Sequence, residues 1–299
     1  MASLPDSAAR AISAVSVDLH LVVALPSEAR PFLDAFRLRA NERHGGMRIY
    51  TGDGVRLVVT GIGKVAASAS VGFLAAAFPD PAIWLNVGIV GHSSRRVGDV
   101  LMVHAAEDRA SGQTYYPPLV VEPPVVTSWL TTVDQPETDY SQDGAFDMEA
   151  TGFFAAARRF QTAELVHSLK VVSDGPEAPI AGITREKITA WVELAVPAVN
   201  ELHARLAPLA LELQAASAPS PAAEELLARW HFSVSDRRAL RRELQRARVL
   251  EAELPAKIFD RARRGLEAVA RLREYLDGLA VQKGSVLGNG PEDGSENGP

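Results

Sequence analysis

Two acids flank a methionine immediately before an apolar, helix-like run. In GAFDMEATGFF, residues 144–154, Asp147 and Glu149 stand on either side of Met148. An unpaired carboxylate is costly to bury, so an acid at the edge of such a segment needs a partner that satisfies its charge. Glu149 is therefore a candidate site residue, and its chemistry depends on which other groups share a pocket with it.

Two further acids lie where strand-like segments end. In ALPSEARPF the strand is expected to end at Leu25, and Glu28 falls in the first turn of the next helix, where the helix dipole favours a negative charge. Asp174 closes the apolar run LKVVSD. Considered separately, Glu28 is explained as a helix-start acid and Asp174 as a loop or cap residue.

Glycines mark two other strand ends. In VTGIGKVAAS, Gly61 and Gly63 join a strand to a helix, where a ligand can approach the backbone closely and meet helix N–H groups. Gly88 lies in WLNVGIVG, a second strand end that contains glycine. Two glycines at a strand–helix turn are by themselves common geometry, so neither segment defines a site alone.

Short β-rich runs alternate with helical patterns through the first two-thirds of the chain. The strand-like runs are LHLVVAL, MRIYTG, VRLVVTGIG, AIWLNVGIV, DVLMVHAA, SWLTTV and LKVVSDG. Helical spacing is found in PSEARPFLDAFRL, KVAASASVGFLAAAF, MEATGFFAAARRF and residues 184–213. This order predicts an α/β fold with a mixed, largely parallel central sheet covered by helices. Ligands of such sheets bind beyond the carboxyl ends of the strands.

Composition limits the classes of function. The chain has 299 residues, 31 Lys and Arg against 37 Asp and Glu, and a net charge of -6, so no overall basic field favours nucleic acid or an anionic membrane. The absence of cysteine excludes disulfides and a cysteine nucleophile. No apolar run approaches the roughly 20 residues that span a bilayer. We expect a cytoplasmic protein without a metal or organic cofactor, since its seven histidines show no metal-binding spacing.

The chain divides into segments of different composition. We expect an N-terminal extension at 1–17, a catalytic domain at 18–213, a linker rich in Ala, Ser and Pro at 214–225, a helical hairpin at 226–283 and a disordered tail at 284–299. The first arm of the hairpin, DRRALRRELQRAR, carries six arginines. Such runs are more often solvated helix faces than nucleic-acid sites, so we favour a solvated face and consider the hairpin as a docking module for a protein.

Several motifs in one order resemble a known superfamily. YTGDGVRLVVTGIGKVAAS, followed by WLNVGIVG, VGDVLMV, FDMEATGFF and VVSD, is similar to the nucleoside phosphorylases and nucleosidases, and most similar to the methylthioadenosine and S-adenosylhomocysteine nucleosidases. The resemblance covers roughly residues 20–210. It implies the three-layer nucleoside phosphorylase fold and a homodimer, and it does not reach the hairpin.

The resemblance also implies roles for individual residues. Glu149 takes the place of the family's glutamate that binds the ribose hydroxyls, Asp174 that of the aspartate facing the purine N7, and Glu28 that of the glutamate orienting the attacking water. The expected substrate-binding residues are Glu149, Met148, Ser173, Gly63, Gly88 and Lys170. Such a set suits cleavage of an N-glycosidic bond, because positive charge develops on the sugar and negative charge on the departing base.

The nucleophile separates two enzyme alternatives. Phosphorylases of this superfamily bind phosphate with cationic and hydroxyl groups, whereas the serine position of NVGIVG is here Ile89, and Glu28 would repel the anion. We therefore expect hydrolysis of a purine nucleoside or 5′-modified adenosine. Arg95 and Arg96 keep the phosphorylase alternative open. A non-catalytic nucleoside-binding protein is the second alternative, although such a protein has no need to keep all three acids.

Some positions depart from the nucleosidase pattern. Pro136 stands near the place of an aromatic residue that stacks on adenine, and Lys170 replaces an arginine that helps to hold the water. His92 stands where the nucleosidases have glycine. Base recognition is therefore expected to differ. The hydroxyls of Tyr115, Tyr116 and Tyr140 are candidates for the rim of the pocket without any support from spacing.

Overall fold

The computed structural model describes residues 17–40, 47–217 and 221–287 and forms two compact units, Met1–Glu212 and Leu213–Pro299. The first unit holds all the strands of the described residues, and the second is helical. None of the helices within these described ranges combines the length and the apolar character needed to cross a membrane. The expected extension at 1–17 lies outside the described residues except for Val17.

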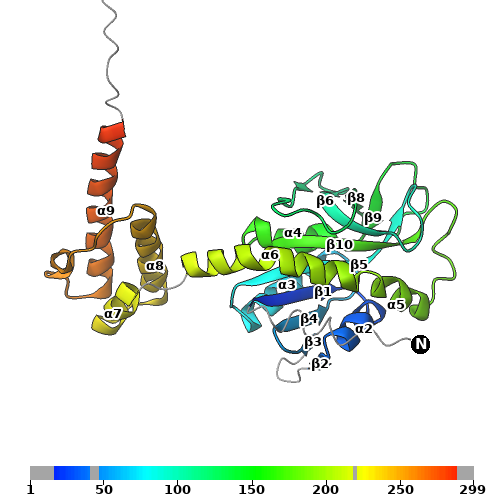
Figure 1. Ribbon diagram of the computed structural model, residues 1–299, viewed down its shortest axis with the longest axis horizontal. Coiled ribbons are helices and arrows are strands. Elements are labelled where there is room, and N and C mark those ends of the chain that lie inside the picture. Colours follow the sequence, from blue (N-terminus) through cyan, green and yellow to red (C-terminus); the bar gives the residue numbers. More distant parts are fainter. Residues whose placement is uncertain (1–16, 41–46, 218–220, 288–299) are drawn as a thin grey trace, which may run out of the picture. The chain divides into compact units, whose positions relative to one another are not determined.

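The first unit is built on a ten-stranded mixed sheet (Figure 1). Its strands are β1 (Asp18–Val23), β2 (Arg39–Ala40), β3 (Arg48–Thr51), β4 (Val55–Val59), β5 (Ala82–His92), β6 (Val100–Asp108), β7 (Thr114–Tyr115), β8 (Thr127–Thr132), β9 (Ala145–Asp147) and β10 (Val166–Asp174). Parallel ladders join β4 to β1, β1 to β5 and β5 to β10. These central strands are mostly apolar and are buried on both faces, as expected for strands covered on both sides.

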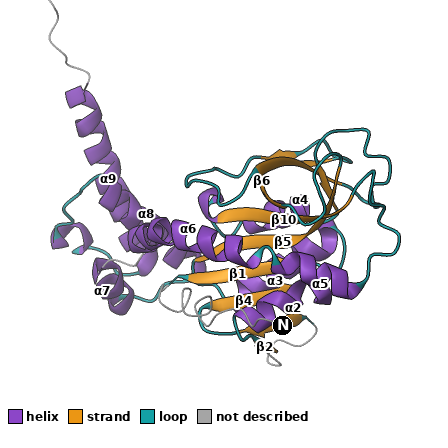
Figure 2. Cartoon of the chain, turned by 45° about the vertical axis from the view of Figure 1, so that its right-hand side comes forward, coloured by secondary structure: helices purple, strands orange, loops and turns teal. Residues whose placement is uncertain are grey.

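The sheet curls and closes on itself beside β5. In order, β5, β10, β6, β8 and β9 pair with one another, and β9 returns to β5 at Gly91 and His92. Figure 2 shows β1, β4, β5 and β10 side by side, with the curled strands beyond them. Because β5 belongs to both the open sheet and the closed ring, its carboxyl end meets β9 and β10 at one place.

Helices lie on both sides of this sheet (Figure 2). The helices of this part of the chain are α2 (Pro26–Ala35), α3 (Lys64–Ala77), α4 (Ala150–Ala157), α5 (Arg185–Glu193) and α6 (Val196–Ser217). Helix α2 packs against α5, and α3 packs closely against α4. Gly152 permits the second contact, because a Cβ there would collide with the carbonyl of Lys64. Two helix starts, those of α3 and α4, are thereby brought together.

The sequence-based fold class is confirmed, and short strands were missed. The seven expected strand runs correspond to β1, β3, β4, β5, β6, β8 and β10. Strands β2, β7 and β9 have only two or three residues, too few for an alternating pattern to be recognised. The omission of β9 matters most, because this strand contains Asp147 and ends two residues before Glu149.

The second unit is a small helical domain with its own core. It contains α7 (Pro221–Arg229), α8 (Val234–Val249), a 3-10 turn at Ala256–Phe259 and α9 (Gly265–Leu287). Helices α8 and α9 form the expected hairpin, around a core that includes Leu240, Leu244, Leu272 and Leu276. The carboxylate of Glu243 is buried in this hairpin, 2.9 Å from Nε of Arg273.

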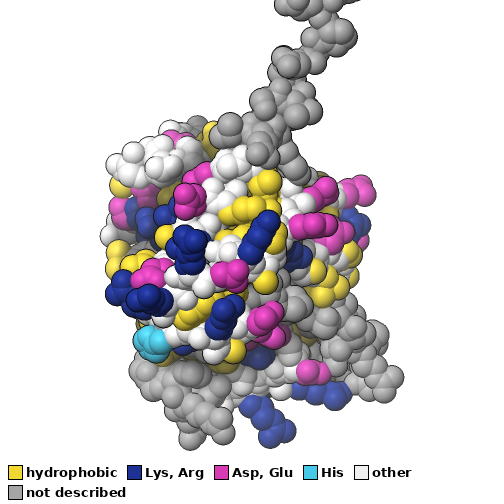
Figure 3. Space-filling model, turned by 90° about the vertical axis from the view of Figure 1, so that its left-hand side faces the viewer, with side chains coloured by type: hydrophobic (Ala, Val, Ile, Leu, Met, Phe, Trp, Pro, Cys, Tyr) yellow, Lys and Arg dark blue, Asp and Glu magenta, His cyan; other side chains and the backbone are white. Residues whose placement is uncertain are grey.

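The helices of the structure extend into the segments that were expected to be the linker and the disordered tail. Helix α6 extends to Ser217 and α7 starts at Pro221, so most of 214–225 is helical. Alanine favours helix and proline is well placed at a helix start, which explains why a segment of low complexity takes this form. Residues 284–287 belong to α9, and the rest of the expected tail lies outside the described residues. In Figure 3 basic side chains are interspersed with acidic and hydrophobic ones.

Candidate active site

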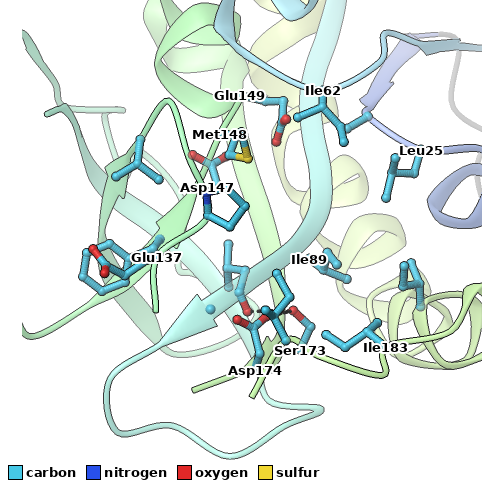
Figure 4. A pocket seen from close by; sticks show the side chains of 18 of the residues that line it. Leu25, Ile62, Ile89, Glu137, Asp147, Met148, Glu149, Ser173, Asp174 and Ile183 are labelled. Carbon is cyan, nitrogen blue, oxygen red and sulfur yellow. Dashed lines mark hydrogen bonds between the residues drawn. The ribbon is translucent and has the colours of Figure 1, made fainter. Parts of the chain in front are cut away.

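One cavity of about 300 Å³ lies in the first unit and is lined by all three predicted acids. Figure 4 shows Glu149 and Met148 at one end and Ser173 and Asp174 at the other. The remaining lining residues are mostly apolar: Ala24, Leu25, Ile62, Ile89, Val90, Gly91, Val133, Pro136, Glu137, Tyr140, Phe146, Asp147, Ile180, Ile183 and Ile188, together with Glu28. The cavity therefore presents five carboxylates in a mostly apolar lining.

Glu28 is held by backbone N–H groups. Its Oε2 accepts from the N–H of Ala24 at 2.8 Å and of Leu25 at 2.9 Å, and its Oε1 accepts from the N–H of Ile89 at 2.9 Å. A Cβ at Gly88 would lie 2.7 Å from Oε1, so the glycine makes room for the carboxylate. Burial raises the pKa of Glu28, and the three N–H donors oppose that rise.

Glu149 occupies the N-cap position of α4 and faces the start of α3. Its Oε1 accepts a hydrogen bond of 2.8 Å from the N–H of Gly63, the N-cap residue of α3 with a φ of 101°. The left-handed backbone of Gly63 explains why glycine is found here. Burial, followed by the nearby Asp147 carboxylate, raises the pKa of Glu149 to about 7. This acid therefore changes charge near neutral pH.

Asp147 and Lys170 form a buried ion pair behind this end of the cavity. Nζ of Lys170 lies 2.8 Å from Oδ2 of Asp147, and both side chains are almost wholly buried. Asp147 also accepts from the hydroxyl of Thr132 at 2.8 Å and from the N–H of Ala150 at 2.9 Å. Lys170 is not among the residues that line the cavity within the described ranges. The positive charge of Lys170 acts through space and opposes the rise in the pKa of both Glu28 and Glu149.

Asp174 is placed by an irregularity at the end of β10. Val172 pairs with Val90 and Asp174 with Gly91, so Ser173 is an extra residue in β10, a β-bulge. Bulges redirect the side chains that follow them, and here the bulge accompanies a carboxylate that lines the cavity. Gly91 is needed opposite, because a Cβ there would lie 3.0 Å from Oδ2 of Asp174 and closer still to the hydroxyl of Tyr140.

The carboxyl group of Asp174 is contacted by two hydroxyls. Oγ of Ser173 lies 2.5 Å from Oδ1, and the hydroxyl of Tyr140 donates to Oδ2. Oγ of Ser173 also lies 3.1 Å from the carbonyl oxygen of Val90. A serine hydroxyl has one hydrogen, so it donates either to the carbonyl or to the carboxylate. If it donates to Val90, its lone pairs are free to accept from a protonated Asp174.

The predicted residues converge, with some exceptions. The cavity is lined by Glu28, Glu149, Asp174, Met148 and Ser173. Gly63 and Gly88 instead contact or accommodate the acids, and Lys170 pairs with Asp147. Among the departures, Pro136 and Ile89 line the cavity, whereas the exposed Arg95 and Arg96 do not. Nδ1 of His92 accepts the N–H groups of Ser94 and Arg95 at 3.1 and 3.2 Å, which gives the ring a local structural role.

Of the three tyrosines considered for the rim, Tyr140 lines the cavity, whereas Tyr115 and Tyr116 do not, and the lining residue Glu137 was missed. Tyr140 and Glu137 are therefore the lining residues that no sequence motif identified. Both come from the segment between β8 and β9, which shows no periodic pattern. Glu137 is already satisfied, because its Oε2 lies 2.7 Å from Nη1 of Arg109 and its Oε1 accepts from two backbone N–H groups. The phenol of Tyr140 donates to Asp174, a contact between segments far apart in the chain that no sequence pattern predicts. Within the described ranges no group of three or more acidic and histidine side chains is arranged to hold a metal ion.

Comparison with known proteins gives matches at the level of structure. The fold is similar to the 5′-methylthioadenosine/S-adenosylhomocysteine nucleosidase of Campylobacter jejuni, with a TM-score of 0.51 and 15% identity over 62% of this chain and 98% of that one. It is also similar to the 5′-methylthioadenosine nucleosidase of Arabidopsis thaliana, with a TM-score of 0.50 and 18% identity over 66% of this chain and 95% of that one. For a futalosine hydrolase mutant of Helicobacter pylori the TM-score is 0.50, with 14% identity over 62% of this chain and 99% of that one.

No family model matches the sequence, and no curated protein matches it either. The resemblance inferred from the motifs is confirmed for the fold: the first unit has the fold of the nucleosidase and hydrolase structures that it matches. Since the matched structures span almost their whole length but only 62–66% of this chain, over a third of the chain has no counterpart in them. At these identities the comparison fixes neither the reaction nor the substrate.

Proposed function

We propose that the protein hydrolyses the N-glycosidic bond of a purine nucleoside or 5′-modified adenosine and releases the free base. The observation that carries this proposal is the convergence of Glu28, Glu149 and Asp174 on one cavity. The similar solved structures are nucleosidases acting on 5′-methylthioadenosine or S-adenosylhomocysteine and a hydrolase acting on futalosine. Because fold does not determine substrate, the proposal extends only to the class of bond that these enzymes cleave.

The two ends of the cavity suit the two charges of the transition state. Positive charge that develops on the ribose is stabilised by carboxylates, and Glu149 is placed to accept hydrogen bonds from the sugar hydroxyls. Asp174, at the opposite end, is placed to give a proton to the departing base. Glu28 accepts the proton of the attacking water, a role favoured by its burial, which makes the carboxylate more basic.

Water suits this cavity better than phosphate. No Lys or Arg side chain of the described residues lines it, and the nearest buried cation, Lys170, is engaged by Asp147. A phosphate ion would enter a mostly apolar pocket lined by five carboxylates, of which only Glu137 and Asp147 are paired with a cation. Its repulsion by Glu28, Glu149 and Asp174 would not be offset. Arg95 and Arg96, which kept the phosphorylase alternative open, are exposed and lie outside the lining set.

Release of free base from a nucleoside panel tests the proposal. Adenosine, inosine, 5′-methylthioadenosine and S-adenosylhomocysteine are each incubated with the full chain, with and without phosphate, and the products are separated by chromatography. We expect base release from at least one adenosine derivative at a rate independent of phosphate. Strict dependence on phosphate would assign the protein to the phosphorylases.

The same panel addresses the non-catalytic alternative. Binding of a nucleoside without release of base, under all the conditions, would identify a nucleoside-binding protein. Glu28→Gln serves as the control that base release comes from this protein, because the amide cannot take a proton from water. A homodimer and the docking of a protein on the α8–α9 hairpin stay predictions. Sedimentation of the full chain, alone and mixed with a candidate partner protein, is the measurement for both.

A further inference from the structure

Tyr140 contacts the acid at the leaving-group end without being part of any motif. Its hydroxyl donates to Oδ2 of Asp174, its ring packs edge to face on Phe146 with centroids 5.8 Å apart, and its side chain lines the cavity. Burial, and secondarily the Asp174 carboxylate, raise the pKa of Tyr140 well above its usual range. The phenol therefore keeps its hydrogen at neutral pH and acts toward a carboxylate as a donor.

The segment around Tyr140 is fastened in place. Nη1 of Arg109 lies 2.7 Å from Oε2 of Glu137, and Nη2 of Arg109 lies 3.2 Å from Oε1 of Gln142. The same guanidinium lies over the ring of Phe146, 5.3 Å from its centroid. Tyr140 itself has a φ of 49°, a left-handed conformation that is unfavourable for a residue other than glycine. Such a conformation persists only where the surroundings determine it.

The opposite wall is shaped for the same contact. A Cβ at Gly91 would collide with the hydroxyl of Tyr140 and lie 2.8 Å from its Cε1 and 3.0 Å from Oδ2 of Asp174. The phenol and the carboxylate together fill the space that any other residue at 91 would occupy. The contact thus depends on three separate segments: the end of β5, the end of β10 and the segment between β8 and β9.

We propose that Tyr140 is a positioning residue for protonation of the leaving base: its phenol holds Oδ2 of Asp174 and stabilises the carboxylate that remains after the proton has left. This inference rests on the proposed function. Hydrogen bonds to an ionised oxygen are about twice as strong as those between neutral groups. The contact therefore strengthens as the proton moves from Asp174 to the base, which lowers the barrier to leaving-group departure.

The proton balance of the step is complete without a further reagent. The C1′–N bond breaks, its electron pair goes to the base, and the carboxyl proton of Asp174 passes to a ring nitrogen of that base. Water adds its oxygen to C1′ and gives a proton to Glu28. Exchange with solvent then returns a proton to Asp174 and removes one from Glu28, while Tyr140 keeps its own hydrogen throughout.

A pair of substrates with different leaving groups tests the inference. Tyr140→Phe keeps the ring and removes the hydroxyl. The matched control is Tyr116→Phe, at a residue that follows β7, is 61% exposed and does not line the cavity. For the best purine nucleoside we expect kcat of Tyr140→Phe to fall about 10-fold to 100-fold, with little change in KM. For 4-nitrophenyl β-riboside, whose leaving group departs as a stable anion, kcat should stay within about 2-fold of wild type.

A double variant checks that Tyr140 acts through Asp174. If it does, Tyr140→Phe added to Asp174→Asn slows release of the purine no further than Asp174→Asn alone. Thermal unfolding of each variant reports whether it is folded.

The outcomes separate the inference from the proposed function. Absence of base release by the wild-type protein overturns both. With an active wild type, equal slowing of the two substrates by Tyr140→Phe, or additive losses in the double variant, overturns the inference alone. Faster turnover of Tyr140→Phe on both substrates would overturn it as well, since the phenol would then merely obstruct the cavity.

Discussion

The two ends of the cavity hold their carboxylates by different kinds of donor. Backbone N–H groups contact Glu28 and, at one end of the cavity, Glu149. At the other end, the contacts to Asp174 come from the hydroxyls of Ser173 and Tyr140. A backbone N–H only donates, so it favours an ionised carboxylate, whereas a hydroxyl both donates and accepts.

This difference matches the two roles that N-glycosidic cleavage requires. Carboxylates that must stay ionised, to take a proton or to offset positive charge, are best held by fixed donors. An acid that alternates between protonated and ionised forms is best held by hydroxyl groups, which can rotate to donate to the ionised form or accept from the protonated form. The apolar walls make both effects larger, because a low local dielectric strengthens each hydrogen bond and raises the cost of an unpaired carboxylate.

The strongest test of the comparison is Asp174→Asn. The amide cannot give up a proton as the acid does, so we expect kcat for purine nucleosides to fall by about 10³-fold. Binding of the nucleoside, measured by calorimetry, should be nearly unchanged. Turnover close to that of wild type would show that the hydroxyl-bound acid is not the proton donor.

Glu149→Gln tests the other end through the pH dependence of stability. In wild type the pKa of Glu149 rises from its usual 4.5 to about 7, so folding favours the protonated acid. The stabilisation is complete below pH 4.5 and is lost as the pH rises to about 7. The glutamine variant carries no such charge. Its free energy of unfolding should exceed that of wild type by up to about 3 kcal/mol at pH 8, measured in urea.

The two curves of this experiment should converge near pH 4.5, where both side chains are neutral. A difference that is independent of pH would mean that Glu149 keeps an ordinary pKa. Catalysis should show the opposite trend, because the proposed role needs the carboxylate: substrate affinity of wild type is expected to improve as the pH rises through about 7.

Gly88→Ala tests the fixed donors around Glu28. The added Cβ, 2.7 Å from Oε1, should push the carboxylate away from the N–H of Ile89. We expect kcat to fall by about 10-fold, the loss of one hydrogen bond to a charged group. The matched control is Gly72→Ala in α3, where nothing lies within 4 Å of the new Cβ. This control should keep wild-type turnover and gain about 1 kcal/mol of stability.

Ser173→Ala should give the smallest effect. It removes one neutral hydroxyl from Asp174 and leaves the phenol of Tyr140 in place. We expect a loss of about 5-fold in kcat, the usual contribution of one such hydrogen bond. A loss as large as that of Asp174→Asn would contradict the view that the two hydroxyls share the support of this acid.

The sequence by itself determined the long strands, the fold class and the three acids. Long apolar runs and their order are local signals, and the motifs that resemble the nucleosidases carried Glu28, Glu149 and Asp174 at readable positions. The alanine-rich linker shows the limit of such signals, since composition alone did not reveal that α6 extends to Ser217 and α7 begins at Pro221.

Only the tertiary structure decided how the acids are held. The pairing of Asp174 with Gly91, the proximity of Gly63 to Glu149 and the placement of Tyr140 each join segments far apart in the chain. The closure of the sheet at β5, together with the packing of α3 on α4, brings these segments together. Contacts of that kind depend on the balance of packing over the whole unit, which no local pattern of residues encodes.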